Sequence, residues 1–176
     1  MVSPQKAPSS KKSRRPLQST KGDRVKIQEL VSDFSLSSTQ GESFSIADLR
    51  GKKVVLFFYP KDNTPGCTTE GIEFNKLLPA FKKAKVEIFG ISRDSLKSHH
   101  NFKCKYEFKF DLLSDVDETV CKIFDVIKEK NMYGKKVLGI ERSTFVIDEN
   151  GILIAEFRKV KAPGHAQAVL DYVKQL

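Results

Sequence analysis

The sequence predicts an α/β fold in which helices flank a central mixed β-sheet. Apolar, β-branched runs typical of buried strands alternate with segments whose apolar residues recur at helical spacing. Two runs near the C-terminus are joined by a turn at Asn150-Gly151, which predicts an antiparallel hairpin beside the parallel strands. With 176 residues, 39% of them hydrophobic, the chain has the length of one ordinary domain and enough apolar residues for a sizeable core.

The first expected elements are an N-terminal hairpin and a strand–helix unit. Residues 34–36 and 42–44 pair in the hairpin, which hinges at Gln40-Gly41. Residues 54–59 (VVLFFY) form an unbroken apolar run, which predicts a strand covered on both faces. Residues 68–81 predict a helix because their apolar side chains are spaced for one helix face: Ile72, Phe74, Leu77, Leu78 and Phe81.

The rest of the chain continues the alternation of strands and helices. Ser95 is placed to cap the first turn of one of these helices. Strands are expected at residues 86–91, 110–113, 143–147 and 152–157, and helices at residues 95–106, 118–124 and from Pro163-Gly164 to near Leu176.

The positive charge of the chain is concentrated at its N-terminus. Residues 1–21 hold six Lys or Arg and no acid, out of a net charge of +9. Residues 1–22 are rich in Pro, Ser and like charges and bury too little apolar surface to offset the entropy of ordering. We therefore expect a disordered basic tail at residues 1–22 and one domain at residues 23–176. The tail has two possible roles: it increases solubility, or it binds nucleic acid or another acidic partner.

Several classes of protein are excluded by composition. No apolar run approaches the ~20 residues that span a bilayer, and no apolar stretch of a secretory signal is present, so no membrane partner is expected. The three cysteines are too few and too far apart for a disulfide scaffold, and their odd count without a secretory signal favours a reducing compartment: the cytoplasm, or the nucleus if a eukaryotic basic tail directs the protein there. The sequence has no clustered Cys/His spacing that would predict a metal site. It also has no glycine-rich loop that would predict a nucleotide cofactor.

The residue best suited to chemistry is Cys67. It follows a predicted buried strand and opens a predicted helix, where unpaired N–H groups and the helix dipole favour the thiolate, the nucleophilic form. Thr64 lies three positions earlier and can bring a hydroxyl to the sulfur or to its target. Pro60 restricts the backbone of the same loop. A lone cysteine at a helix start is more often an inert apolar residue, so the surrounding motif decides the interpretation.

That motif resembles a known family. Pro60-x-x-x-Thr64-x-x-Cys67 is similar to the P-x-x-x-T/S-x-x-C motif of the peroxiredoxins, and FFYPKDNTPGCTTE resembles their bacterioferritin-comigratory (PrxQ) branch. Segments 90–115, 134–151 and 160–173 are also similar to that branch. The resemblance runs from about Val31 to the C-terminus.

The resemblance implies a thioredoxin-like fold and a thiol-dependent peroxidase that reduces hydrogen peroxide and organic hydroperoxides, without metal or other cofactor. It assigns Cys67 as the peroxidatic cysteine that becomes a sulfenic acid, Thr64 as its hydrogen-bonding partner, Pro60 as the shield against water and Arg142 as the cation beside the sulfur. A guanidinium suits that role because it can follow negative charge from the sulfur to the leaving oxygen. The family also implies a monomer reduced by thioredoxin, glutaredoxin or a small thiol.

The chain departs from the branch at the thiol that resolves the sulfenic acid. Ile72 and Lys103 stand where the branch places resolving cysteines, and Cys104 lies one residue beyond. One residue rotates a helical side chain by ~100°, so Cys104 would need local unwinding to reach Cys67. A one-cysteine cycle with an external thiol stays equally open, and Cys121 is expected in the core.

The remaining candidates are interpreted as structural. His99 and His100 are expected on a solvated helix face and His165 in a structural position. Glu70 suits the helix dipole and is a candidate to orient Arg142, for which a weak surface pairing with Glu141 is the alternative. Two rival functions remain: a peroxide-sensing redox switch, and a binding module that acts through the basic tail.

Overall fold

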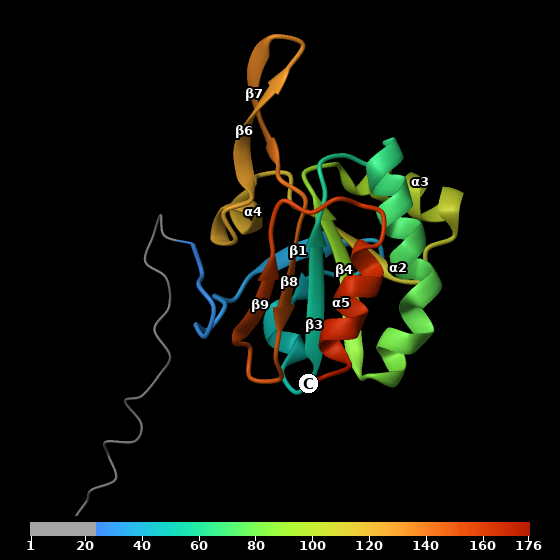
Figure 1. Cartoon of the computed structure of the whole chain (residues 1–176), viewed down its shortest axis with the longest axis vertical. Coiled ribbons are helices and arrows are strands. Elements are labelled where there is room, and N and C mark those ends of the chain that lie inside the picture. Colours follow the sequence, from blue (N-terminus) through green and yellow to red (C-terminus); the bar gives the residue numbers. More distant parts are fainter. Residues whose placement is uncertain (1–23) are drawn as a thin grey trace, which may run out of the picture.

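Strand β3 (Lys53–Phe58) lies in the interior of the sheet that organises the fold. It runs parallel to β4 (Val86–Ser92) and antiparallel to β8 (Ser143–Ile147) within a seven-stranded mixed sheet of order β2-β1-β5-β4-β3-β8-β9. The structure is a computed structural model and describes residues 24–176; Figure 1 shows the sheet with helices along its faces. The expected tail of residues 1–22 lies outside the described residues.

The other elements complete the sheet and cover it. The strands are β1 (Ser35–Ser38), β2 (Phe44–Ser45), β5 (Asp111–Ser114), β9 (Leu153–Phe157) and the separate pair β6 (Ile127–Met132) and β7 (Lys135–Ile140). The helices are the 3-10 turn η1 (Ile46–Leu49), α2 (Pro65–Lys83), α3 (Leu96–Tyr106), α4 (Thr119–Ile123) and α5 (His165–Val173). Within the described residues, none of these helices is long and apolar enough to cross a membrane.

The side chains of β3 alternate between two apolar clusters, one on each face of the sheet. Val54, Leu56 and Phe58 join α4 and η1 on one face. Their neighbours Val55 and Phe57 pack with α2, α3 and α5 on the other face. Because both sides of β3 are buried, its unbroken apolar sequence is explained. The strand end that leads into α2 is held rigidly from both faces.

Most of the predicted elements are confirmed. The N-terminal hairpin forms between β1 and β2, with Gly41 at φ +102° in its turn. Ser95 caps α3 by accepting a hydrogen bond from the Ser98 N–H at 3.2 Å. The hairpin of β8 and β9 turns at Gly151, whose φ of +81° a glycine adopts without steric cost.

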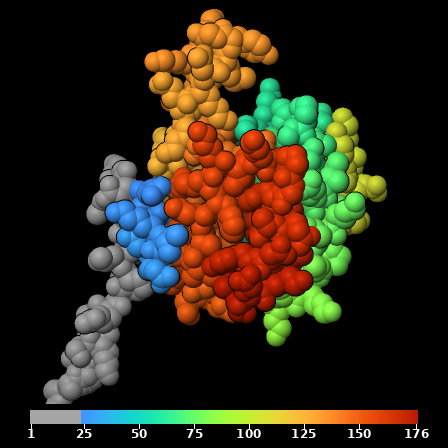
Figure 2. Space-filling model, in the orientation of Figure 1, coloured from blue at the N-terminus to red at the C-terminus, as the bar shows by residue number. Residues whose placement is uncertain are grey.

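The hairpin of β6 and β7 was not predicted. Figures 1 and 2 show it extending away from the body of the molecule. Its strands pair only with each other and are mostly exposed, although Ile140 at the end of β7 is buried, and they lack the apolar alternation from which strands were predicted. Tyr133-Gly134 make the turn with φ of +52° and +80°, and the glycine was its one sequence signal.

Candidate active site

Cys67 lies in the first turn of α2, at the C-terminal end of β3. Thr64 is the residue before the helix, in an extended conformation, and Pro65 begins it, where a missing N–H costs nothing. The Cys67 side chain is 1% exposed and packs in the cluster that α2 shares with the sheet. The sulfur is therefore buried beside the positive end of a 19-residue helix.

Arg142 approaches this sulfur from the segment between β7 and β8. Its Nη2 lies 3.6 Å from Cys67 Sγ, and its Nη1 donates to Glu70 Oε1 at 2.7 Å. Burial lowers the pKa of Arg142, but the Glu70 carboxylate and the Cys67 sulfur outweigh it and raise that pKa above its usual value. The surface pairing with Glu141 does not form: the Arg142 side chain turns inward, to the start of α2.

Gly66 makes this approach of Arg142 possible. A Cβ at Gly66 would lie 2.8 Å from Arg142 Nη2, closer than non-bonded atoms allow. The missing side chain therefore leaves the space in which the guanidinium contacts the helix start.

Glu70 holds the other side of the guanidinium. It is fully buried, and burial raises its pKa to about 7, although Arg142 opposes that shift. Its second oxygen, Oε2, has no hydrogen-bond partner among the described residues. Such a buried carboxylate is costly unless a cation accompanies it. The pairing that sequence reasoning raised for Glu70 and Arg142 is therefore present.

Pro60 and Arg142 also line a cavity of about 340 Å³ that opens to solvent. Lys130 lies in its wall, with its side chain across Gly139 and its Nζ donating to the Ile140 carbonyl. Burial, and then Arg142, lower the pKa of Lys130. The remaining lining residues are Lys128, Glu129, Glu141, Lys159 and Val160. The cavity is thus positively charged beside the guanidinium.

The Thr64 hydroxyl does not donate to the Cys67 sulfur, although its position three residues before Cys67 suggested such a contact. Its Oγ1 donates to the Lys61 carbonyl at 2.8 Å, which closes the loop before α2, and makes no hydrogen bond to Cys67. The lone pairs of the hydroxyl oxygen can still accept a hydrogen bond. Thr64 therefore shapes the loop in this structure and does not contact the sulfur by a hydrogen bond.

The other two cysteines lie away from this site. Cys104 is exposed on α3, and Cys121 is buried in the core on α4, as expected. Burial, together with the Asp115 carboxylate, raises the pKa of the Cys121 thiol well above its usual value, so the neutral thiol persists. All three thiols are free.

The prediction for His99 is wrong. His99 is fully buried, with Nδ1 2.7 Å from Asp62 Oδ2 and Nε2 2.9 Å from the Leu113 carbonyl. The signal that could have found it is Phe102, three residues later on the same helix face, which marks that face as buried. His100 is exposed, as expected.

His165 has a structural position, as predicted. It is buried at the start of α5, with Nε2 2.7 Å from Thr144 Oγ1. Burial, with a smaller effect of Arg142, lowers its pKa to about 4, so it is neutral at physiological pH.

Known proteins resemble this chain along most of its length. Residues 27–156 match the model of the AhpC/TSA family. Peroxiredoxin Bcp of Xanthomonas campestris is 56% identical over 142 residues, which cover 81% of this chain and 89% of that protein. Peroxiredoxin Bcp of Bacillus subtilis is 42% identical over 152 residues, 86% of this chain and 97% of that protein.

Solved structures of peroxiredoxins are similar to this chain as well. The bacterioferritin comigratory protein of Xanthomonas campestris has a TM-score of 0.77 at 55% identity, covering 81% of this chain and 90% of that chain. A cysteine-to-serine variant of Xylella fastidiosa PrxQ has a TM-score of 0.83 at 45% identity, covering 88% of this chain and 98% of that chain. The thioredoxin-like α/β fold is confirmed.

The fold and these relatives define a thiol-dependent peroxidase of the peroxiredoxin class. The chain belongs to the AhpC/TSA family, within its Bcp, or PrxQ, branch.

The contact between Gly66 and Arg142 predicts that Gly66→Ala displaces the guanidinium from the sulfur. We expect kcat/KM for hydrogen peroxide to fall by about tenfold, or about 1.4 kcal/mol. The free energy of unfolding should fall only modestly, because alanine favours the helix while the displaced arginine weakens its pairing with the buried Glu70 carboxylate. Steady-state kinetics and urea unfolding measure the two quantities. An unchanged kcat/KM would show that the position of Arg142 does not matter.

Glu70 predicts a pH-dependent stability that a neutral side chain removes. Between its ordinary pKa of 4.5 and its folded pKa of about 7, the folded chain binds more protons at this group than the unfolded chain does. The free energy of unfolding therefore falls as pH rises through that range, by up to about 3 kcal/mol from this group. Glu70→Gln keeps the oxygen that accepts from Arg142 and stays neutral, so it should lack this fall.

Urea unfolding of wild type and Glu70→Gln at about pH 5 and about pH 8 measures the effect. Wild type should lose stability relative to the variant at the higher pH. Parallel pH profiles for the two proteins would contradict the raised pKa of Glu70.

Proposed function

We propose that Cys67 is the peroxidatic cysteine of this peroxidase and that it reduces hydrogen peroxide and organic hydroperoxides. The observation that carries the proposal is the 3.6 Å approach of Arg142 Nη2 to Cys67 Sγ at the start of α2. A permanent cation and the positive end of a helix both stabilise a thiolate. No other cysteine of the chain has such surroundings: Cys121 lies beside the Asp115 carboxylate, and Cys104 is exposed on α3.

The proposed step is a displacement at a peroxide oxygen. The thiolate sulfur forms an S–O bond, the O–O bond breaks, and its electron pair leaves on the distal oxygen, which takes up a proton as water or an alcohol. Cys67 is oxidised to a sulfenic acid and the peroxide is reduced. The Arg142 donors lie where they can follow the negative charge from sulfur to the leaving oxygen.

Thr64 and Pro60 are proposed to complete the site from the loop before α2. The Thr64 hydroxyl proton is used by the Lys61 carbonyl, so its oxygen is free to accept a hydrogen bond from the peroxide O–H. Pro60 lines the cavity beside Arg142, and we propose that its apolar ring shields the sulfur from water. The cavity of about 340 Å³ has room for an alkyl group, and the related Xanthomonas campestris protein is described by its alkyl peroxide reduction activity.

The assignment of Cys67 predicts that Cys67→Ser stops peroxide consumption, because a hydroxyl at this position stays protonated and is a poor nucleophile. Peroxide loss with dithiothreitol as reductant is the measurement. Cys104→Ser is the matched control, and it should keep the reaction because an external thiol can replace Cys104. Unchanged turnover of Cys67→Ser would exclude Cys67, and oxidation without steady-state turnover in wild type would favour a peroxide-sensing switch.

We propose Cys104 as the resolving thiol, on the support that it is exposed and lies on α3, one residue past the position that the branch uses. Cys67 is buried and Cys104 is exposed on α3, and a disulfide needs Cα atoms within about 7 Å, so we expect the start of α2 and the end of α3 to unwind for Cys67 and Cys104 to meet. Lys103 occupies the branch position and pairs with Asp111 at 2.6 Å.

The assignment of Cys104 predicts that a Cys67–Cys104 disulfide forms after treatment with a stoichiometric amount of hydrogen peroxide. Non-reducing electrophoresis and peptide mapping detect it. Exchanging the two residues, Lys103→Cys with Cys104→Lys, returns the thiol to the branch position and should speed disulfide formation. If wild type forms no such bond while the exchanged variant does, Cys104 is not the resolving thiol and an external thiol completes the cycle.

The remaining proposals concern the setting of the enzyme. The family implies a thiol reductant, and we propose thioredoxin, with glutaredoxin or a small thiol as alternatives. Three free cysteines in the chain suit a reducing compartment such as the cytoplasm. The net charge of +9 opposes self-association and supports a monomer.

A further inference from the structure

A buried polar cluster lies beneath the loop that leads to Cys67. Its centre is Asp62, midway between Pro60 and Thr64. Asp62 Oδ1 accepts from the Tyr59 hydroxyl at 2.6 Å, and Oδ2 accepts from Ser98 Oγ at 2.8 Å and lies 2.7 Å from His99 Nδ1. We call Tyr59, Asp62, Ser98 and His99 the Asp62 cluster. Tyr59, Asp62 and His99 are buried, and Ser98 is half-buried.

His99 connects the loop to the sheet. Its Nε2 lies 2.9 Å from the Leu113 carbonyl, which can only accept, so Nε2 carries a proton. A second proton lies between Nδ1 and the Asp62 carboxylate, 2.7 Å apart. The imidazole therefore spans from β5 to the loop. Both of its nitrogens are occupied by protein groups.

The same geometry argues against a metal at this place. Ligand atoms of Asp62, Asp94 and His99 lie within 4.8 Å of one another. Both oxygens of Asp62 and both nitrogens of His99 are already engaged. Asp94 Oδ2 likewise accepts from the Asp62 N–H at 2.8 Å and from Ser92 Oγ at 2.6 Å. Hydrogen bonds to these groups indicate that the cluster fixes the position of the loop.

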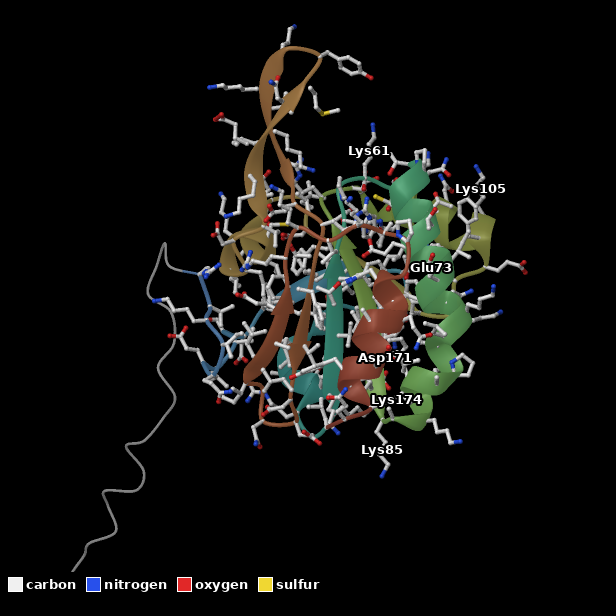
Figure 3. All side chains as sticks on the ribbon, in the orientation of Figure 1. Lys61, Glu73, Lys85, Lys105, Asp171 and Lys174 are labelled. Atoms are coloured by element: carbon white, nitrogen blue, oxygen red, sulfur yellow. The ribbon has the colours of Figure 1, made fainter. Side chains whose placement is uncertain are left out.

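The loop depends on Asp62 for its place. Of residues 60–64, only Asp62 is buried, whereas Lys61 is exposed and points outward, as Figure 3 shows. Asn63 follows with φ of +59°, and its Oδ1 accepts from Lys105 and Tyr106 at the far end of α3. The loop is thus bound to the first turn of α3 through Asp62 and to its last turn through Asn63.

We propose that His99 and Asp62 are positioning residues, which hold the 60–64 segment over Cys67 so that peroxide reacts only while the first turn of α3 is folded. This inference rests on the proposed role of Cys67. Pro60 and Thr64 flank Asp62, so a shift of Asp62 moves both. If the unwinding of α3 that brings Cys104 to Cys67 extends to its first turn, the bond between His99 and Asp62 has to break. The cluster therefore couples the order of α3 to the reactivity of the loop.

Two substitutions at one position separate this role from a purely structural one. An asparagine amide lies near the place of Nδ1 and keeps a donor to Asp62, whereas a glutamine amide lies near the place of Nε2 and keeps the donor to the Leu113 carbonyl. Each variant loses one of the two buried hydrogen bonds of His99. We expect His99→Gln to slow the oxidation of Cys67 by about tenfold, and His99→Asn to stay within about threefold of wild type.

The measurement is single-turnover oxidation of Cys67 by hydrogen peroxide in a Cys104→Ser background, with the oxidised sulfur located by mass spectrometry. Thermal unfolding of each variant is recorded beside it. His100→Gln, on the exposed face of the same helix, is the control and should match wild type. Tyr59→Phe, which removes one donor to Asp62 and keeps the ring, should fold and should slow oxidation by about threefold.

The positioning role is overturned if His99→Gln and Tyr59→Phe oxidise Cys67 at the wild-type rate, or if His99→Asn is slowed as much as His99→Gln in step with its loss of thermal stability. It is also overturned if only His99→Asn is slow, since the bond to Leu113 would then be the one that matters. Failure of the proposed function gives a different result, because oxidation of wild type would then not be found on Cys67.

Discussion

A guanidinium held against a buried sulfur is the interaction on which the rest of this site depends. Arg142 contacts Cys67 through one nitrogen and Glu70 through another, at 3.6 Å and 2.7 Å. The contact brings together residues 75 positions apart, so it exists only when β3, α2 and β8 are assembled. Burying the Glu70 carboxylate costs free energy of folding, because its Oε2 has no partner among the described residues. The same carboxylate holds the Arg142 guanidinium beside the sulfur.

The sheet explains why this contact can be rigid. β3 and β8 are neighbouring antiparallel strands, and Phe58 faces Ser143 across their ladder. The residue that follows Phe58 begins the loop to Cys67, and the residue before Ser143 is Arg142. The register of β3 against β8 therefore determines the positions of both Cys67 and Arg142. The buried apolar clusters on the two faces of β3 prevent that register from shifting.

The sequence predicted the strands and helices that bury apolar residues, and it predicted the loop of Cys67. Both kinds of feature depend on the spacing of residues that are close together in the chain. The sequence did not predict the β6–β7 hairpin, whose strands are mostly exposed. It also did not predict the burial of His99, whose polar neighbours Lys97, His100 and Lys103 dominate the local composition. Tertiary partners also decide the direction of single side chains. Thr64 closes its own loop and Arg142 turns to Glu70, and neither outcome follows from spacing alone.

The polar character of the Asp62 cluster has a consequence for dynamics. An apolar contact between the loop and α3 would be favourable in many registers, whereas a carboxylate with three donors is satisfied in one arrangement only. When α3 opens, water can solvate the same groups, so the loop can leave and return without exposing a large apolar surface. In the proposed cycle the buried sulfur of Cys67 meets a peroxide in one state and a thiol in another, and a reversible attachment of the loop suits that exchange. α3 carries both His99 and the exposed Cys104.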